Sequence, residues 1–189
     1  GANTLAKLAK GSDDEVLTLA SGVPSWAEAA GGGKLLQVQS YSTDERHSSS
    51  AGSMTDLTSF LVTLTPAATT SRIWINVSIG MYGSVGEMAT FAVERAISGG
   101  ATALCPPVGA DSGNRVGGHG RVYSQGSDGG SGISFSILDI THNTTSEITY
   151  QVQWAVDQAS YINRAYNDSD NACNGARTVS GITAWEIGA

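Results

Sequence analysis

Three histidines are the side chains best suited to acid–base chemistry in this chain: His47, His119 and His142. Catalysis or metal binding by a histidine needs a partner held at fixed geometry. All three lie in stretches whose composition predicts loops, and His119 stands between Gly118 and Gly120. We therefore expect solvated loop histidines, with His119 on an exposed tip, rather than a catalytic or metal-ligating pair.

Oxygen-bearing side chains gather in segment 167–171, which reads Asn-Asp-Ser-Asp-Asn. Alternating oxygen ligands suit Ca²⁺, but the downstream glutamate that completes an EF-hand loop is missing. A turn rich in Asn and Asp is the favoured interpretation, so we expect no metal. The glycine-rich stretch 126–132 is not followed by the Lys-Ser/Thr pair that holds a phosphate, and we expect no cofactor.

The two cysteines, Cys105 and Cys173, lie 68 positions apart. They could form a disulfide if the protein matures in an oxidising compartment. Two buried free thiols are the alternative, and the sequence leaves both open. Their spacing does not match a metal site.

Paired carboxylates could cleave glycans, because glycosidases place two Asp or Glu side chains across the scissile bond. Adjacent carboxylates occur in segments 13–15 and 44–45, and neither segment is predicted to line a cleft. No Gly-x-Ser-x-Gly is found in a strand–turn–helix context. We therefore expect a protein that is not an enzyme.

Charge and composition narrow the function classes further. The net charge is −7 and Lys and Arg form no cluster, so we expect no nucleic-acid partner. No apolar run approaches the ~20 residues that span a bilayer, so no membrane insertion is expected. Charged residues make up only 14%, and 24 glycines are present, which favours tightly turned β structure and buried oligomeric surfaces.

The elements that must position these side chains are strands, because apolar and polar residues alternate through most of the chain. The expected strands are Lys34–Tyr41, Leu57–Thr65, Arg72–Tyr82, Met88–Ile97, Ala101–Cys105, Ile133–Ile140, Ile148–Val156, Ser160–Tyr166 and Gly181–Ile187. Turns rich in Gly, Pro, Asn and Asp join them. The pattern predicts an all-β fold: an antiparallel β-sandwich, jelly-roll-like, over 34–189. Residues 106–132 are expected to form a long exposed loop around one short strand.

Some expected strands are apolar on both faces. Trp74 lies opposite the stripe of Ile73 and Ile75, and Trp185 likewise lies opposite an apolar stripe. A two-faced apolar strand in a sandwich predicts a subunit interface, whereas scattered surface aromatics would need none. Arg164 and Glu186 are isolated charges in such strands, either paired with each other or between subunits, or facing solvent.

The N-terminal segment predicts a β ribbon that cannot be stable alone. Two short apolar pieces, 16–19 and 23–26, are separated by Ser21-Gly22 and followed by three glycines. A two-stranded ribbon this short is marginal in water. Its apolar side chains, Leu17, Leu19, Val23 and Trp26, must therefore be covered by something else. We place a connector at 1–33 and the head domain at 34–189.

Several motifs resemble those of bacteriophage tail-fibre proteins. Lys10-Gly11-Ser12, Val16-Leu17, Gly22 and Trp26-Ala27 resemble a connector that joins a fibre shaft to a globular head. Leu64-Thr65-Pro66, Leu138-Asp139, Asn143-Thr144-Thr145, Ile162-Asn163-Arg164 and Gly181–Ile187 resemble successive parts of a recurrent head domain. The resemblance spans Lys10 to Ile187, while the 106–132 loop follows no family pattern.

The resemblance implies a homotrimer in which three connectors interlock through Leu17, Leu19, Val23 and Trp26. It implies a virion protein of the tail fibre, assembled in the cytoplasm of the bacterial host. Other phage tail or baseplate proteins would bind on the N-terminal side. The head would adsorb to a host surface glycan or outer-membrane protein. A structural head fibre or capsid decoration protein without a receptor role is the alternative.

Loops on a rigid β scaffold are where receptor specificity is expected. Two loops carry aromatic side chains beside hydrogen-bonding groups, a combination that can contact sugars or proteins. The candidate receptor-binding residues are His119, Arg121 and Tyr123 in the first loop and Tyr166 and Asp168 in the second.

Overall fold

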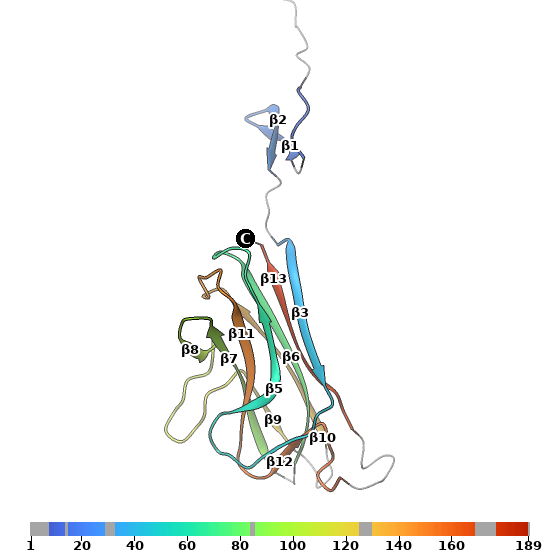
Figure 1. The fold of residues 1–189 in the computed structure, drawn as a ribbon, viewed down its shortest axis with the longest axis vertical. Coiled ribbons are helices and arrows are strands. Elements are labelled where there is room, and N and C mark those ends of the chain that lie inside the picture. Colours follow the sequence, from blue (N-terminus) through green and yellow to red (C-terminus); the bar gives the residue numbers. More distant parts are fainter. Residues whose placement is uncertain are drawn as a thin grey trace, which may run out of the picture.

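The computed structural model describes residues 8–13, 15–28, 33–83, 86–124, 130–168 and 177–188, and all of their regular structure is β (Figure 1). The N-terminal strands are β1 (Glu15–Ala20), β2 (Val23–Glu28), β3 (Leu35–Thr43), β4 (His47–Ser49) and β5 (Thr55–Leu64). The central strands are β6 (Arg72–Gly83), β7 (Met88–Ile97), β8 (Thr102–Leu104) and β9 (Gly120–Tyr123). The last four are β10 (Gly130–Asp139), β11 (Ile148–Val156), β12 (Ser160–Ile162) and β13 (Ser180–Ile187). The predicted all-β class is confirmed.

Two antiparallel sheets pack face to face. In the six-stranded sheet β3 pairs with β13 and β13 with β6, while β12 joins β6 to β4 and β10 pairs with the other edge of β6. The five-stranded sheet has the order β5-β11-β7, and β7 pairs with both β8 and β9. The predicted antiparallel sandwich is therefore confirmed.

The core lies between these sheets and follows the period-2 pattern of the sequence. On β6, Ile73, Ile75, Val77 and Ile79 are at most 1% exposed. The inward side of β11 contributes Tyr150, among other side chains, from the opposite sheet. Full burial of such a side chain contributes roughly 1.5–3 kcal/mol, so these two strands form the centre of the domain.

Two local features differ from the sequence-based expectation. The short strand β4 was not predicted, because its three residues show no apolar alternation. The strand expected over 160–166 ends at Ile162, since Asn163 adopts a φ of 60° that an extended strand does not allow. Asn163 is buried, and its side-chain amide donates to the carbonyls of Thr43 and Glu45.

Glu186 was expected either to form a salt bridge with Arg164 or another subunit or to face solvent, and the structure shows a buried carboxylate instead. Glu186 lies on β13, is 0% exposed, and does not pair with Arg164. Its two oxygens accept hydrogen bonds from the amide of Ala67 and from the Gln37 side chain, each at 2.6 Å. Burial raises its pKa, but the hydrogen bonds that its carboxylate accepts outweigh this and hold the pKa below the ordinary value. Arg164 instead lies over the ring of Tyr161.

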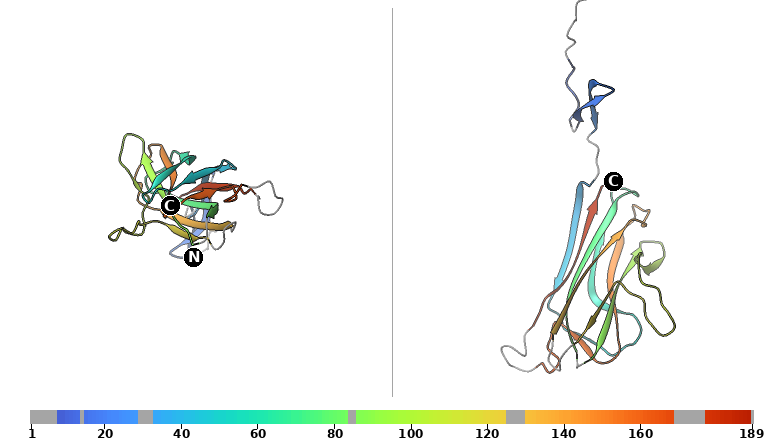
Figure 2. Two further views of the ribbon diagram at one scale, coloured as in Figure 1. Left: turned by 90° about the horizontal axis from the view of Figure 1, so that it is seen from below. Right: turned by 180° about the vertical axis from the view of Figure 1, so that it is seen from behind.

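The N-terminal ribbon and the C-terminal strand lie at the same end of the molecule. The amide of Gly33 donates to the carbonyl of Gly188 at 3.1 Å, and Gly188 donates to Lys34 at 2.8 Å. The β1–β2 ribbon forms a sheet of its own and stands beyond this end in both the front and rear views (Figures 1 and 2). We call this the ribbon end, and the opposite end, where β9 and β12 lie, the distal end. The division into a connector and a head at residue 33 stays a prediction.

Among the described residues, no helix is long and apolar enough to cross a bilayer.

Candidate binding surfaces

The ribbon displays the four apolar side chains predicted to form a trimeric neck. Leu17 pairs with Trp26 across the two strands and Leu19 with Pro24, so these share one face, whereas Val23 lies on the other. Leu17, Leu19 and Val23 are more than half exposed, and Trp26 is 38% exposed. Both faces of the ribbon therefore present apolar surface that a single chain leaves in water.

The Trp26 indole is supported by the segment that precedes the ribbon. Its Nε1 donates to the carbonyl of Ala9 at 2.6 Å. The chain crosses the indole so closely at Gly11 that a Cβ there would lie 2.5 Å from the ring. Segment 8–11 thus fixes the orientation of Trp26, although the side chain stays partly exposed.

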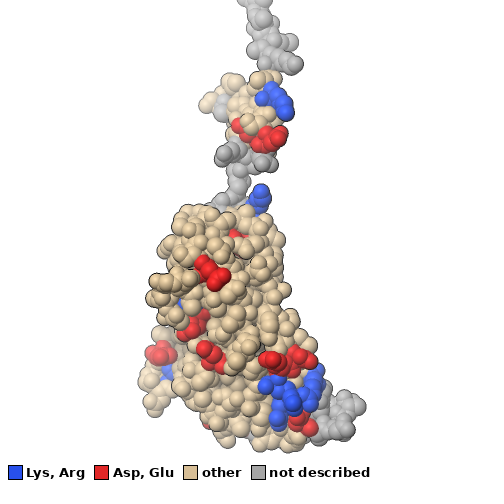
Figure 3. Space-filling view, viewed as in Figure 1, with Lys and Arg blue, Asp and Glu red and all other residues tan. Residues whose placement is uncertain are grey.

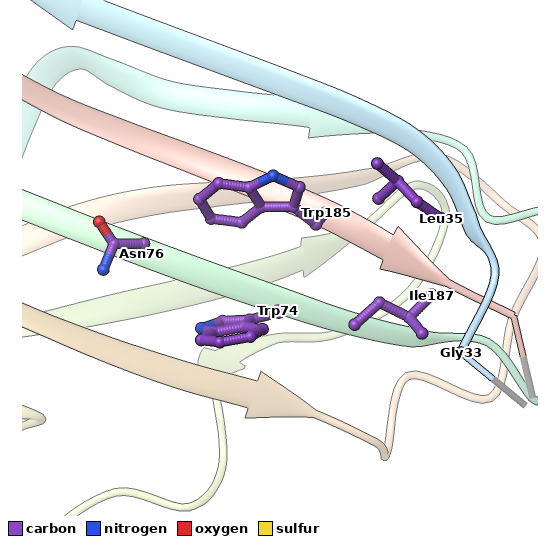
Figure 4. Close-up of a pocket in the computed structure, with 6 residues that line it drawn as sticks. All are labelled: Gly33, Leu35, Trp74, Asn76, Trp185 and Ile187. Atoms are coloured by element: carbon purple, nitrogen blue, oxygen red, sulfur yellow. The ribbon is translucent and has the colours of Figure 1, made fainter.

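The outer face of the six-stranded sheet carries an apolar row at the ribbon end. Val38, Trp185, Trp74 and Leu138 lie side by side in the register of β3, β13, β6 and β10. The two indoles are tilted by 54° with their centroids 6.2 Å apart. They line a cavity of about 290 Å³ together with Gly33, Leu35, Asn76 and Ile187 (Figure 4). Of the four side chains in the row, Val38, Trp74 and Leu138 are each more than 40% exposed.

Toward the distal end, two further rows of this outer face consist of small uncharged residues, while the exposed Arg72 lies on the same face at the ribbon end, opposite Ile187. The next row reads Ser40, Thr183, Asn76 and Ser136, and the following one Ser42, Gly181, Ser78 and Ser134. Sheet faces in contact with water usually carry long polar and charged side chains, whereas interface centres are depleted of charge. We refer to the apolar row and these two uncharged rows as the flat face.

The outer face of the five-stranded sheet is different. It carries Glu94 on β7 and Asp56 on β5. The side-chain amide of Gln153 donates to the Asp56 carboxylate at 2.8 Å and also hydrogen-bonds to Glu94. Burial raises the pKa of Glu94, and the nearby charge of Asp56 raises it further. Figure 3, which views the molecule from the same side as Figure 1, shows separate acidic groups over this side of the sandwich, a few basic groups, and a mixed cluster at the distal end. This pattern is that of a solvated face.

His119 is a structural anchor and not the exposed tip that the sequence predicted. Its ring nitrogen Nδ1 accepts the amide of Val93 at 3.0 Å, so Nε2 carries the proton and donates to the carbonyl of Cys105 at 2.7 Å. Its own amide donates to Phe91. The ring stacks on Phe135 at 6.1 Å and 5°. Burial lowers the pKa of His119, which agrees with a neutral ring.

The other two histidines also differ from solvated loop residues. His142 is 3% exposed, and its ring nitrogens contact the carbonyls of Ser71 and Thr144 at 2.7 and 3.1 Å. His47 lies on β4 and is half-buried, with its pKa lowered mainly by burial. All three imidazoles therefore belong to the scaffold.

The loop before His119 is folded rather than extended. Gly109 and Gly118 share a backbone hydrogen bond, Ser112 and Arg115 form a bridge, and the Asp111 carboxylate accepts the amide of Gly117 at 2.6 Å. We call residues 109–118 the loop hairpin. The one short strand expected within 106–132 is β9, whereas the loop hairpin and the start of β10 at Gly130 were not predicted.

Arg121 and Tyr123 are exposed on β9, as expected of candidate receptor contacts. Arg121 lines a cavity of about 330 Å³ between the loop hairpin, β7, β9 and the end of β11. The other lining residues are Gly52, Met88, Thr90, Asn114, Arg115, Val116, Ala155, Val156 and Asp157. Sequence reasoning missed Arg115 and Asp157, because only the fold brings these separate segments to the same cavity.

Tyr166 and Asp168 lie beyond β12 in a second group at the distal end. Tyr166 packs edge-on against Tyr161 at 5.5 Å. Asp168 pairs with Arg46 at 3.0 Å and with Arg177 at 3.1 Å. Figure 3 shows basic and acidic groups gathered over this end. The five predicted receptor residues thus divide between β9 with its preceding residue and the segment after β12.

The cysteine pair and the Asn/Asp-rich turn are described only in part. Cys105 is a buried thiol whose pKa is raised to about 12, mainly by burial and then by the charge of Asp139. Cys173 and residues 169–171 lie outside the described residues, so the disulfide stays a prediction. No group of three or more His, Cys, Asp or Glu side chains that could hold a metal is found within the described segments.

Comparison with known proteins leaves the family open. No protein-family model matches the chain, and no curated protein matches it. Among solved structures, the VP2 subviral particle of infectious bursal disease virus matches with 13% identity and a TM-score of 0.35, over 95% of this chain and 50% of that one. The Gx strain of the same virus gives 15% identity and a TM-score of 0.37, over 92% and 41%. This chain spans at most about half of those chains, and TM-scores this low do not establish a common fold.

Proposed function

We propose that this protein is the distal head of a trimeric bacteriophage tail fibre, which binds the host surface without catalysing a reaction. The observation that carries the proposal is the apolar surface gathered at the ribbon end. The ribbon and the row of Val38, Trp185, Trp74 and Leu138 both lie there. Burying them requires other chains, and the tail-fibre resemblance of the connector supplies the stoichiometry of three.

The flat face supports the same assembly. Its Ser, Thr, Asn and Gly side chains are short and uncharged, so a neighbouring sheet could approach it closely without desolvating a charge. The apolar row adds the hydrophobic contribution that such a contact needs. We propose that another copy of this chain covers the flat face. Gly33, the first described residue after the ribbon, lines the cavity on this face, so the flat face and the ribbon lie close enough to share one interface.

The position of the polar groups supports host recognition at the distal end. A trimer joined at the ribbon would leave β9, the loop hairpin and the segment after β12 pointing away from the shaft. These elements carry the cavity lined by Arg121 and the group around Asp168. Such a head would be a virion component, with other tail or baseplate proteins on the ribbon side.

Two measurements test the proposal together. Light scattering of the full chain at two concentrations should give three times 19.4 kDa, and a concentration-independent monomer would overturn the trimer. Labelled protein should bind bacteria that the parent phage infects, and replacing residues 110–116 with a short Gly-Ser turn should abolish this binding. A trimer that binds no such strain would favour a structural head fibre or capsid decoration protein.

A further inference from the structure

We propose that the cavity between the loop hairpin, β7 and β9 binds a carboxylate-bearing sugar residue, held by Arg115 and Arg121. The role of this sugar as a receptor rests on the proposed function, but the binding site itself does not. The cavity has a volume of about 330 Å³, within the size range of small-molecule sites.

Two uncommitted cations distinguish this cavity. Arg115 and Arg121 are exposed, and within the described part of the chain neither belongs to an ion pair. Arg121 contacts the sulfur of Met88, and no carboxylate of the described residues pairs with it. A guanidinium presents parallel N–H donors that match a carboxylate in a bidentate geometry. In a chain with a net charge of −7, two such groups beside one cavity favour an anionic ligand.

The remaining cations of the distal end are already engaged. Arg46 and Arg177 both pair with Asp168. Arg164 lies 4.1 Å from the centroid of the Tyr161 ring and donates to neighbouring carbonyls. Among the described residues, the two arginines of the cavity are therefore the ones at this end that neither an ion pair nor an aromatic ring holds.

Asp157 is the acidic group of the cavity, and its carboxylate is partly occupied. Its oxygen Oδ1 accepts the amide of Met88 at 2.8 Å, while its own amide donates to the carbonyl of Met88. The cavity thus holds two arginines against one aspartate. The second Asp157 oxygen can accept a hydrogen bond from a hydroxyl group. A sugar carries such a group, whereas an inorganic anion such as sulfate does not.

The uncharged lining also fits a sugar. Thr90 and Asn114 add hydrogen-bonding side chains, while Ala155 and Val156, both at most 6% exposed, supply an apolar floor. A pyranose ring has hydroxyls on its rim and C–H groups on its faces, so it needs both kinds of contact. An acidic segment of a protein receptor is the competing ligand, but a volume of about 330 Å³ accommodates one small unit better than a folded surface.

The wall that carries Arg115 is held in place before any ligand arrives. A Cβ at Gly117 would lie 1.8 Å from the carbonyl oxygen of Gly109, and one at Gly118 would lie 2.5 Å from the Thr90 methyl group. The hairpin therefore packs tightly on itself and on β7. His119 anchors its end through both ring nitrogens. A preorganised wall lowers the entropic cost of binding.

The test is titration of the full chain with sodium glucuronate and N-acetylneuraminate, followed by calorimetry or saturation-transfer NMR. Glucose is the neutral control ligand, and sodium phosphate and a short poly-glutamate peptide are the competing anions. The variants are Arg115→Gln and Arg121→Gln. Arg72→Gln is the matched control, because Arg72 is exposed at the other end of the sandwich. Thermal melting of each variant checks that the fold is intact.

We expect at least one acidic sugar to bind, glucose to bind more weakly, and each cavity variant to weaken acidic-sugar binding about tenfold. Arg72→Gln should leave it unchanged. Absence of acidic-sugar binding, or binding that neither cavity variant weakens, overturns the site. Equal binding of phosphate or poly-glutamate overturns the ligand class. If Arg121→Gln loses sugar binding but still adsorbs to cells, the sugar site is confirmed and its role as the receptor site is wrong.

Discussion

Arg95 on β7 and Asp139 on β10 form an ion pair that joins the two sheets across the edge of the sandwich. Nη1 of Arg95 donates to both carboxylate oxygens of Asp139 at 2.8 Å, and Asp139 is 0% exposed. Tyr150 and Thr141 donate to the same carboxylate. Burial raises the pKa of Asp139, but these hydrogen bonds and the Arg95 charge lower it below its ordinary value.

Arg95→Met should destabilise the protein strongly, because it leaves the buried Asp139 carboxylate without its cation. Breaking a buried pair by removing one partner typically costs about 3–5 kcal/mol. Arg46→Met is the matched control, since the Arg46 side chain is 51% exposed and exposed pairs contribute at most about 1 kcal/mol. Urea unfolding measures both, and equal losses in the two variants would contradict the role of the Arg95 pair.

His119 should make stability depend on pH. Its pKa in the folded state is lowered from 6.5, so the unfolded chain takes up a proton at a higher pH than the folded chain does. Stability that is present above pH ~6.5 should therefore fall as the pH drops toward the folded pKa. His119→Gln should remove this part of the slope. We would compare melting temperatures of both proteins from pH 8 to 5, where parallel curves would contradict the prediction.

Leu17→Ser combined with Trp26→Ser should lower the melting temperature and dissociate the proposed trimer, because both side chains lie on the same exposed ribbon face. Light scattering and thermal melting measure the two effects. Thr58→Ser, at an exposed position on β5, is the control. An intact assembly in the double variant would place the subunit contacts elsewhere.

Ser78→Arg should prevent assembly while leaving the monomer folded. Ser78 is exposed at the centre of the flat face, so a long cation there meets water in the monomer but another chain in the trimer. Thr63→Arg, which is exposed on β5 of the other sheet, should have no effect on assembly. Sedimentation of the two variants side by side distinguishes them, and a trimeric Ser78→Arg would show that the flat face is free.

The sequence predicted the sheets well because burial on one face imposes period-2 alternation. The apolar stripe from Ile73 to Ile79 predicted β6 to within one residue of its observed end. Trp74, on the opposite side of the strand, indicated the apolar outer face. The loop hairpin could not be predicted in this way. Its contacts are made by backbone groups of Gly109, Gly117 and Gly118, which leave no apolar pattern.

The candidate site was predicted only where one segment carries it. Arg121 stood out beside Tyr123, but Arg115 and Asp157 come from other segments and meet Arg121 only in the fold. The interpretation of His119 failed for a related reason. Flanking glycines indicate exposure in a sequence, whereas here they let the backbone approach β7 closely enough for the ring to bond Val93 and Cys105.

The anchor of the loop hairpin has a consequence for how the surface at the distal end could change during evolution. His119 bonds main-chain groups of Val93, Cys105 and Phe91 and so makes no polar contact with their side chains. Substitutions in 112–116 leave these main-chain bonds of His119 and the Asp111–Gly117 hydrogen bond in place. If the protein binds a host receptor as proposed, the hairpin tip can vary while its anchor on β7 stays unchanged, as a variable loop does on a constant scaffold.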